Sequence, residues 1–114
     1  MNDCLFCKIV AGQIPSEKIY EDDRTYAFLD IAPQAEAHIL VIPKAHMRNV
    51  AECVDLGDEL IAHLMRTVVN IAREKGLDKT GFRLATNCGV HAMQTVDHLH
   101  IHILGGAPLS PRLG

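Results

Sequence analysis

Apolar residues recur at helical spacing between residues 55 and 75, and they predict one long amphipathic helix. The apolar stripe consists of Leu56, Leu60, Ile61, Leu64, Met65, Val68 and Ala72. Asp55 is a candidate cap for the start of this helix, and Gly76 can take the left-handed conformation that closes its end. We expect this helix to cover one face of a sheet.

Elsewhere the pattern changes to short apolar and β-branched runs, which favour strands. The expected strands cover residues 19–21, 25–30, 38–42 and 82–86, and the histidine-rich stretch that ends at Gly105-Gly106 supplies the last. Residues 22–24 suit a hairpin turn, and residues 4–12 a short helix. Strands that surround a single long helix predict an α+β fold, with an antiparallel sheet of about five strands in one domain over residues 1–114.

The last expected strand, VDHLHIHILGG, carries three histidines at alternate positions. In a strand His98, His100 and His102 share one face, while the apolar residues between them point into the core. Neighbouring histidines then lie ~6–7 Å apart and the outer two ~13 Å apart. Because zinc–nitrogen bonds are only ~2.0–2.1 Å long, the three cannot easily share one ion. A row of solvated side chains is the simpler alternative, but a solvated face favours Thr, Lys or Glu, so we expect the histidines to divide their labour.

Composition narrows the classes of function. The net charge is −3 and no basic run occurs, which argues against a nucleic-acid surface but not against a nucleotide site. No apolar run approaches the ~20 residues of a membrane span, and the first ten residues lack the features of a secretion signal. We therefore expect a cytoplasmic protein, without a membrane or nucleic-acid partner. Its four cysteines are then thiols or metal ligands, and the pair Cys4 and Cys7 suits metal binding, redox use or burial.

The run His-apolar-His-apolar-His-apolar-apolar, from His98 to Leu104, resembles the signature of the histidine triad (HIT) superfamily. Four further segments resemble its branch of histidine triad nucleotide-binding proteins: CLFCKIVAGQIPS from Cys4, YEDD from Tyr20, AFLDIAPQ from Ala27 and HILVIPKAH from His38. The resemblance runs from about residue 4 to residue 106. It implies a homodimer that binds purine nucleotides and cleaves nucleoside phosphoramidates, such as adenosine 5′-monophosphoramidate, at the α-phosphorus.

The same resemblance assigns roles to single residues. It implies that His100 is a nucleophile that forms a covalent nucleotidyl-histidine, because neutral imidazole offers a lone pair near physiological pH. We expect a main-chain carbonyl to fix its tautomer. The other implied site residues are His102 and His38 at the phosphate, Thr95 near the leaving group, Gln94 and Asn87 on the phosphate or leaving-group side, Asp30 at the ribose, and Phe28, Leu29 and Ile31 around the base. Taken without the resemblance, Asp30 also suits a strand end and Asn87 a turn.

The resemblance further implies a structural zinc ion held by Cys4, Cys7, His46 and His98, a closed set of four ligands. His98 then serves the metal, while His100 and His102 serve phosphate chemistry. Three features depart from the branch: Met93 replaces a usual glycine, Asp97 replaces a common aromatic residue, and the tail over residues 107–114 lacks an aromatic residue. A dinucleoside polyphosphate hydrolase and a nucleotide-binding regulatory dimer with little catalysis remain alternative functions. Cys53, Cys88, His63 and His91 receive no role.

Overall fold

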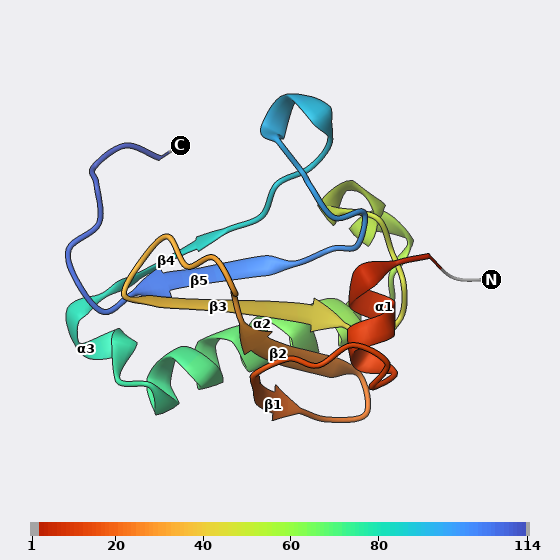
Figure 1. Ribbon diagram of the computed structural model, residues 1–114, viewed down its shortest axis with the longest axis horizontal. Helices are drawn as coiled ribbons and strands as arrows, with labels where there is room; N and C mark the ends of the chain where they lie inside the picture. The colour runs from red at the N-terminus through yellow and green to blue at the C-terminus, as the bar shows by residue number, and fades with distance from the viewer. Residues whose placement is uncertain (1–2, 114) are drawn as a thin grey trace.

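A computed structural model describes residues 3–113, and at its centre lies one antiparallel sheet (Figure 1). The strands are β1 (Lys18–Glu21), β2 (Thr25–Leu29), β3 (Ala37–Pro43), β4 (Phe82–Ala85) and β5 (Ile101–Gly105). Their order in the sheet is β1-β2-β3-β5-β4, and every neighbouring pair is antiparallel. The α+β fold predicted from the sequence is thus confirmed, and β4 forms one edge of the sheet.

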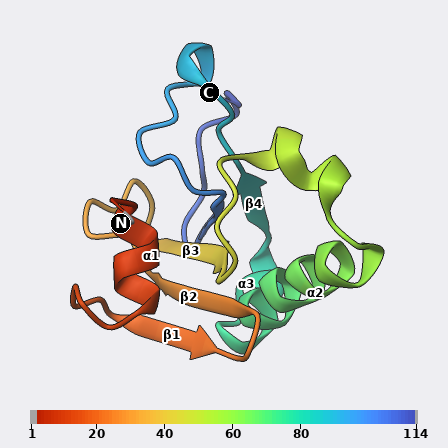
Figure 2. The same cartoon turned by 90° about the vertical axis from the view of Figure 1, so that its right-hand side faces the viewer.

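Helices lie on both sides of this sheet. They are α1 (Leu5–Val10), α2 (Asp58–Glu74) and α3 (Leu77–Thr80), with two short 3₁₀ helices, η1 (Val50–Asp55) and η2 (Val90–Ala92). Figure 2 shows α1 and α2 on opposite sides of the strands. Among the described residues, no helix is long and apolar enough to cross a membrane.

The predicted long helix starts three residues later than expected. Asp55 ends η1 instead of capping α2, because Leu56 is extended and Gly57 occupies the N-cap without a side-chain bond. The prediction at the other end is confirmed, since Gly76 has a φ of 74° in the left-handed region. Periodicity therefore located the body of the helix but not its first turn.

The sheet is buried on both faces, and each face has its own core. Alternate residues of β3 serve the two cores: Ile39 and Val41 pack on the side of α2, while Leu40 and Ile42 pack on the side of α1. The α2-side core also contains Leu99, Val68, Ile71 and Ile103, all almost fully buried. Facing α1, Phe6 and Phe28 meet edge to face with ring centroids 5.4 Å apart.

The histidine-rich strand is shorter than predicted. β5 begins at Ile101, so His98 and His100 precede it. The reason is local: the His98 N–H donates to the Val96 carbonyl and the Leu99 N–H to the Met47 carbonyl, instead of joining the strand ladder. The alternation of side chains nevertheless persists, since Leu99 packs into the α2-side core while His100 faces Phe6 of α1. The histidines therefore do share the α1 side of the sheet.

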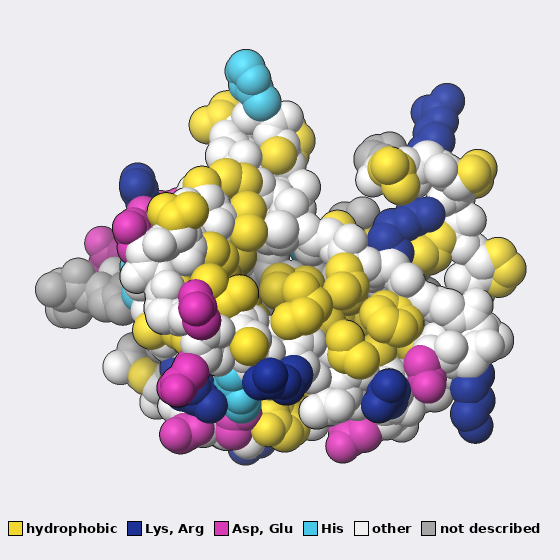
Figure 3. Space-filling view, turned by 180° about the vertical axis from the view of Figure 1, so that it is seen from behind, with side chains coloured by type: hydrophobic (Ala, Val, Ile, Leu, Met, Phe, Trp, Pro, Cys, Tyr) yellow, Lys and Arg dark blue, Asp and Glu magenta, His cyan; other side chains and the backbone are white. Residues whose placement is uncertain are grey.

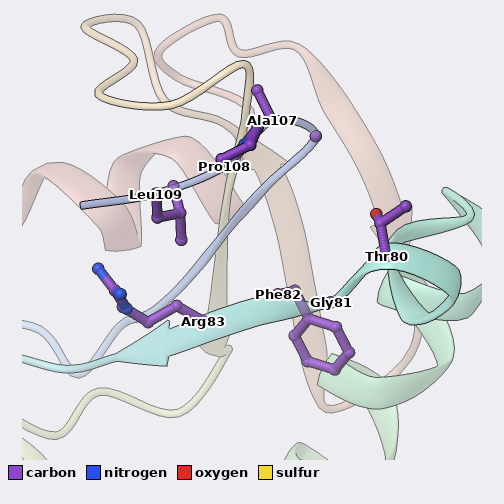
Figure 4. A pocket seen from close by; sticks show the side chains of 8 residues that line it. Thr80, Gly81, Phe82, Arg83, Ala107, Pro108 and Leu109 are labelled. Atoms are coloured by element: carbon purple, nitrogen blue, oxygen red, sulfur yellow. The ribbon is translucent and has the colours of Figure 1, made fainter. Parts of the chain in front are cut away.

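The C-terminal tail bends back beside the start of β4. A hollow of about 470 Å³ separates the two, lined by Phe82 and Arg83 of the strand and by Pro108 and Leu109 of the tail (Figure 4). The Arg83 guanidinium holds the tail by donating to the Ser110 carbonyl at 2.7 Å and to that of Arg112 at 3.1 Å.

Candidate functional site

The central histidine has its proton fixed on one nitrogen. Nδ1 of His100 lies 2.7 Å from the carbonyl oxygen of His98, and because a carbonyl only accepts, Nδ1 carries the hydrogen. In the neutral ring the lone pair is then on Nε2, which has no hydrogen-bond partner among residues 3–113. The ring of Phe6 packs against His100 edge to face, at a centroid distance of 5.1 Å. The main-chain acceptor predicted from the sequence is confirmed, and it leaves a nucleophilic nitrogen available.

His102 and His38 form a hydrogen-bonded pair beside it. Nε2 of His38 lies 2.8 Å from Nδ1 of His102, and the rings of His102 and His100 are 5.1 Å apart. Burial lowers the pKa of His38, although the charge of Asp30 opposes the shift. Burial, with the charges of His100 and His38, lowers the pKa of His102 to about 4. Both rings are therefore neutral at physiological pH.

The main chain decides where the two neutral rings carry their protons. The Gln34 N–H donates to Nδ1 of His38 at 3.1 Å, so that nitrogen is bare and the hydrogen of His38 is on Nε2. His38 then donates to Nδ1 of His102, which places the hydrogen of His102 on its own Nε2. This N–H has no partner in the described part of the chain. The site thus offers a lone pair on His100 and an N–H donor on His102.

Asp30, directly after β2, adds an anion to this group. Its Oδ1 accepts the Ala32 N–H at 2.8 Å, and its Oδ2 lies 3.4 Å from Nε2 of His38. Asp30, His38 and His102 together have the side-chain types of a metal site. In the observed arrangement, however, Nε2 of His38 carries a hydrogen and has no lone pair for a metal. We therefore treat these three residues as a hydrogen-bonding group.

The other predicted site residues fall into two sets. Phe28 lies in the α1-side core, while Leu29 and Ile31 are exposed beside Asp30, Ile31 almost completely. The second set holds the loop before the histidines: Asn87 donates to the Ala92 carbonyl, and Gln94 donates to the carbonyls of Arg48 and Val96 and accepts from Gly89 N–H. Asn87 and Gln94 are thus bound to the main chain in this structure. Thr95 is exposed and lines a hollow with Cys4 and His46.

A second cluster brings together the four predicted metal ligands. Nδ1 of His98 lies 3.3 Å from Sγ of Cys4 and 3.5 Å from Sγ of Cys7, and Nδ1 of His46 lies 3.3 Å from Sγ of Cys7. The two histidine Nδ1 atoms are 3.2 Å apart. A tetrahedral zinc ion separates such donors by about 3.3–3.8 Å, given its bond lengths. Nε2–H of His98 donates to the Pro43 carbonyl at 2.8 Å, which leaves Nδ1 bare for an ion.

Sequence reasoning missed Phe6, Gln34 and Pro43, which orient the histidines. Gln34 and Pro43 act through backbone atoms, so no side-chain pattern reveals them. Phe6 had a signal, because Phe6 and Ile9 stand three apart on the short first helix and form its apolar side. That spacing indicates a helix docked by Phe6, though not onto which residue.

The chain is similar in sequence and in structure to known proteins. The HIT domain family matches residues 11–109. An uncharacterised HIT-like protein of Synechococcus elongatus is 47% identical over 95% of this chain and 94% of that protein. The purine nucleoside phosphoramidase of Escherichia coli K12 is 38% identical over 97% of this chain and 93% of the enzyme. Among solved structures, a HIT family hydrolase of Clostridium thermocellum superposes with a TM-score of 0.90 at 40% identity, covering 99% of this chain and 98% of that one.

Proposed function

Because the chain belongs to the HIT family and is a hydrolase, we propose that it cleaves purine nucleoside phosphoramidates at the α-phosphorus. The observation that carries the proposal is the pairing of a bare Nε2 on His100 with an Nε2–H donor on the adjacent His102. The first is a nucleophile for phosphorus, and the second is a hydrogen-bond donor for a phosphoryl oxygen. The phosphoramidase relative in Escherichia coli supports the choice of substrate.

The reaction follows from this arrangement in two displacements. Nε2 of His100 attacks the α-phosphorus and forms a bond to it, the phosphorus–nitrogen bond of the substrate breaks, and the leaving nitrogen takes a proton from solvent and departs as the amine. Water then attacks the same phosphorus and gives a proton to solvent, the bond to His100 breaks with its electron pair returning to Nε2, and the nucleoside monophosphate is released. His102 stabilises the charge on the phosphoryl oxygens through its Nε2–H in both steps.

Residues at the end of β2 recognise the nucleoside. The Asp30 carboxylate accepts hydrogen bonds from the vicinal ribose hydroxyls, since two oxygens can serve two neighbouring donors. Asp30 Oδ2 lies 3.4 Å from Nε2 of His38, which supports a sugar bound beside the histidines that face the phosphate. The exposed Leu29 and Ile31 offer apolar contact to the base.

Steady-state hydrolysis tests the proposal. We expect the wild-type protein to turn over adenosine 5′-monophosphoramidate faster than a diadenosine polyphosphate. We expect His100→Ala to lose at least about 10³-fold in kcat, because the variant lacks the nucleophile. The matched control is His91→Ala, an exposed histidine of η2 that keeps full activity. Preference for the diadenosine compound favours the polyphosphate hydrolase instead. Tight AMP binding with no turnover of either substrate favours a regulatory dimer.

We also propose that Cys4, Cys7, His46 and His98 hold a structural zinc ion. The donor atoms match a tetrahedral zinc set in type and spacing, and a set of four protein ligands leaves no position for activated water. When bound, the ion supplies a cross-link between α1 and the segment before β5. Elemental analysis of undenatured protein is expected to find one zinc per chain, and a metal-free, fully folded protein contradicts the proposal.

Finally, we propose that the active protein is a homodimer formed through β4 and α2. Among residues 3–113 no strand pairs with the outer edge of β4, and an apolar hollow lies beside it. Its lining includes Val50, Ile61, Met65 and Leu84, all at least one-third exposed. Figure 3 shows hydrophobic side chains gathered on this side of the molecule. A twofold axis lets one such patch cover another, as in most small oligomers.

A further inference from the structure

One N–H, that of His38 Nε2, faces two groups that compete for it. Nδ1 of His102 accepts it at 2.8 Å, while Oδ2 of Asp30 lies 3.4 Å from the same nitrogen as a longer electrostatic contact. The Gln34 N–H holds the opposite side of the ring, so His38 cannot reverse its tautomer without placing two donors face to face. The side chain of His38 is only 2% exposed and that of Asp30 20% exposed, so water screens this competition only weakly.

From this competition we propose that His38 is a positioning residue that couples ribose binding at Asp30 to the phosphate-facing His102. The inference rests on the proposed phosphoramidate hydrolysis and adds a consequence to it. It assigns the 2′- and 3′-hydroxyls of the substrate an effect on the chemical step, in addition to any effect on binding.

The physical basis is a chain of donors. Donation from His38 to Nδ1 polarises the ring of His102 and strengthens its Nε2–H as a donor, because successive hydrogen bonds reinforce one another. The Asp30 charge draws the same N–H away from His102. Ribose hydroxyls that donate to the carboxylate reduce this pull, so the His38 hydrogen bond to His102 shortens when the sugar is bound. A substrate without these hydroxyls leaves the competition in place.

A direct role for His38 as a phosphate ligand fits the geometry less well. Its Nδ1 is occupied by Gln34, and its single hydrogen is directed at His102. A phosphate that recruited this hydrogen would leave Nδ1 of His102 without its donor. The arrangement thus favours action through His102.

The first test measures tautomers and needs no substrate. Nitrogen-15 NMR of the histidine rings is expected to show His102 with its hydrogen on Nε2 alone. In His38→Leu the Nδ1–H form of His102 gains population, whereas His38→Gln, whose amide can still donate, retains the wild-type form. His102 carrying its hydrogen on Nδ1 in the wild-type protein overturns the proposal.

The second test compares adenosine phosphoramidate with its 2′,3′-dideoxy analogue. In the wild-type protein we expect kcat to fall at least about fivefold with the analogue, a typical coupling between sites. In His38→Leu and in Asp30→Asn the two substrates share nearly the same kcat, while KM still distinguishes them in His38→Leu because Asp30 is intact. His38→Gln restores the effect on kcat.

The outcomes separate this inference from the proposed function. If the wild-type protein hydrolyses both substrates with equal kcat and unequal KM, the coupling is absent and the proposed hydrolysis stands. An effect on kcat that persists in His38→Leu likewise overturns the coupling, because it does not pass through His38. If neither phosphoramidate is hydrolysed, the proposed function fails, and with it the coupling.

Discussion

Met93 is the non-glycine residue with a positive φ among residues 3–113, at 62°, directly before Gln94. A non-glycine residue held at positive φ destabilises the folded state by about 1–3 kcal/mol. Glycine avoids this strain, but it loses about 0.5–1 kcal/mol more conformational entropy on folding. We therefore expect Met93→Gly to raise the free energy of unfolding by about 1 kcal/mol in urea titrations. The neighbouring Ala92→Gly, which lies in η2, is the control and lowers it. Loss of stability in both variants contradicts the backbone argument.

Asp22 is the most heavily hydrogen-bonded carboxylate described, and it ties the β1–β2 turn to α2. Its oxygens accept from the backbone of Arg24 and Thr25, from the Tyr20 hydroxyl and from Nε2–H of His63, each at 2.8 Å. Burial raises the pKa of Asp22, but these hydrogen bonds outweigh it and lower the pKa well below its ordinary value.

A depressed carboxyl pKa stabilises the fold above the unfolded value near 3.8 and loses that contribution as the pH falls below it. Asp22→Asn is therefore expected to lower the free energy of unfolding at pH 7 by about 2 kcal/mol, a common value for hydrogen bonds to a charged group. The difference from wild type shrinks towards pH 3. The exposed Asp23→Asn is the control and changes stability by less than about 0.5 kcal/mol. A constant difference between pH 7 and pH 3 contradicts the argument.

At the scale of residues, the sequence predicted which histidines lie on one side of the sheet, but not which backbone groups orient them. Period-two spacing was sufficient to place His98, His100 and His102 on one side and to require that they divide their labour. It did not reveal that Gln34 and Pro43 orient His38 and His98, because those contacts use backbone atoms that every residue type possesses.

At the scale of elements, α1 depends on what surrounds it. It has six residues, too few for a stable isolated helix. Cys4 caps its start by accepting the Cys7 N–H, and Phe6 and Ile9 bury its inner side. The proposed zinc ion adds two covalent anchors to this helix, so its docking and the metal are coupled.

Zinc removal is therefore expected to loosen α1 and to leave α2 intact. After chelation, backbone hydrogen exchange of residues 5–10 accelerates, that of α2 is unchanged, and the melting temperature falls by several degrees, about 4–8 °C per kcal/mol lost. Cys7→Ser reproduces the effect without chelator, while Cys53→Ser, which is outside the cluster, remains sensitive to chelation. Unchanged exchange in α1 contradicts the coupling.

The elements that the sequence predicted well are those with a long or regular pattern. The stripe of α2 repeats over several turns, so its body was found, whereas η1 and α3 are too short to show a period. The last strand begins later than predicted, and the cause is a tertiary contact. A hydrogen bond between Leu99 and Met47 replaces the ladder there, and local sequence does not encode that partner.

At the scale of the whole molecule, the proposed homodimer does not depend on the other proposals, and it has its own test. Leu84 lies on edge strand β4 and Ile61 on α2, both beside the apolar hollow. Leu84→Lys places a charge in the proposed interface and is expected to convert a dimer to a monomer in light scattering after gel filtration. Leu5→Lys, at the exposed side of α1 across the sheet, leaves the mass unchanged. A wild-type monomer contradicts the proposal.

The overall architecture was predicted in class but not in strand order. Strands in sequence around one helix imply an antiparallel sheet, and the β1–β2 hairpin follows from its turn. The placement of β5 between β3 and β4 joins segments far apart in the chain, so only the folded structure shows it. That placement brings His38 of β3 beside His102 of β5, and so creates the site.

The most direct test of the account is rapid-quench mass spectrometry of the protein mixed with adenosine 5′-monophosphoramidate. We predict an adenylyl group on the peptide that contains His100, with fragmentation assigning it to that histidine, and no such group in His100→Ala. Release of AMP at the wild-type rate without an adduct, or an adduct on His102 or His38 instead, contradicts the assignment of His100 as the nucleophile.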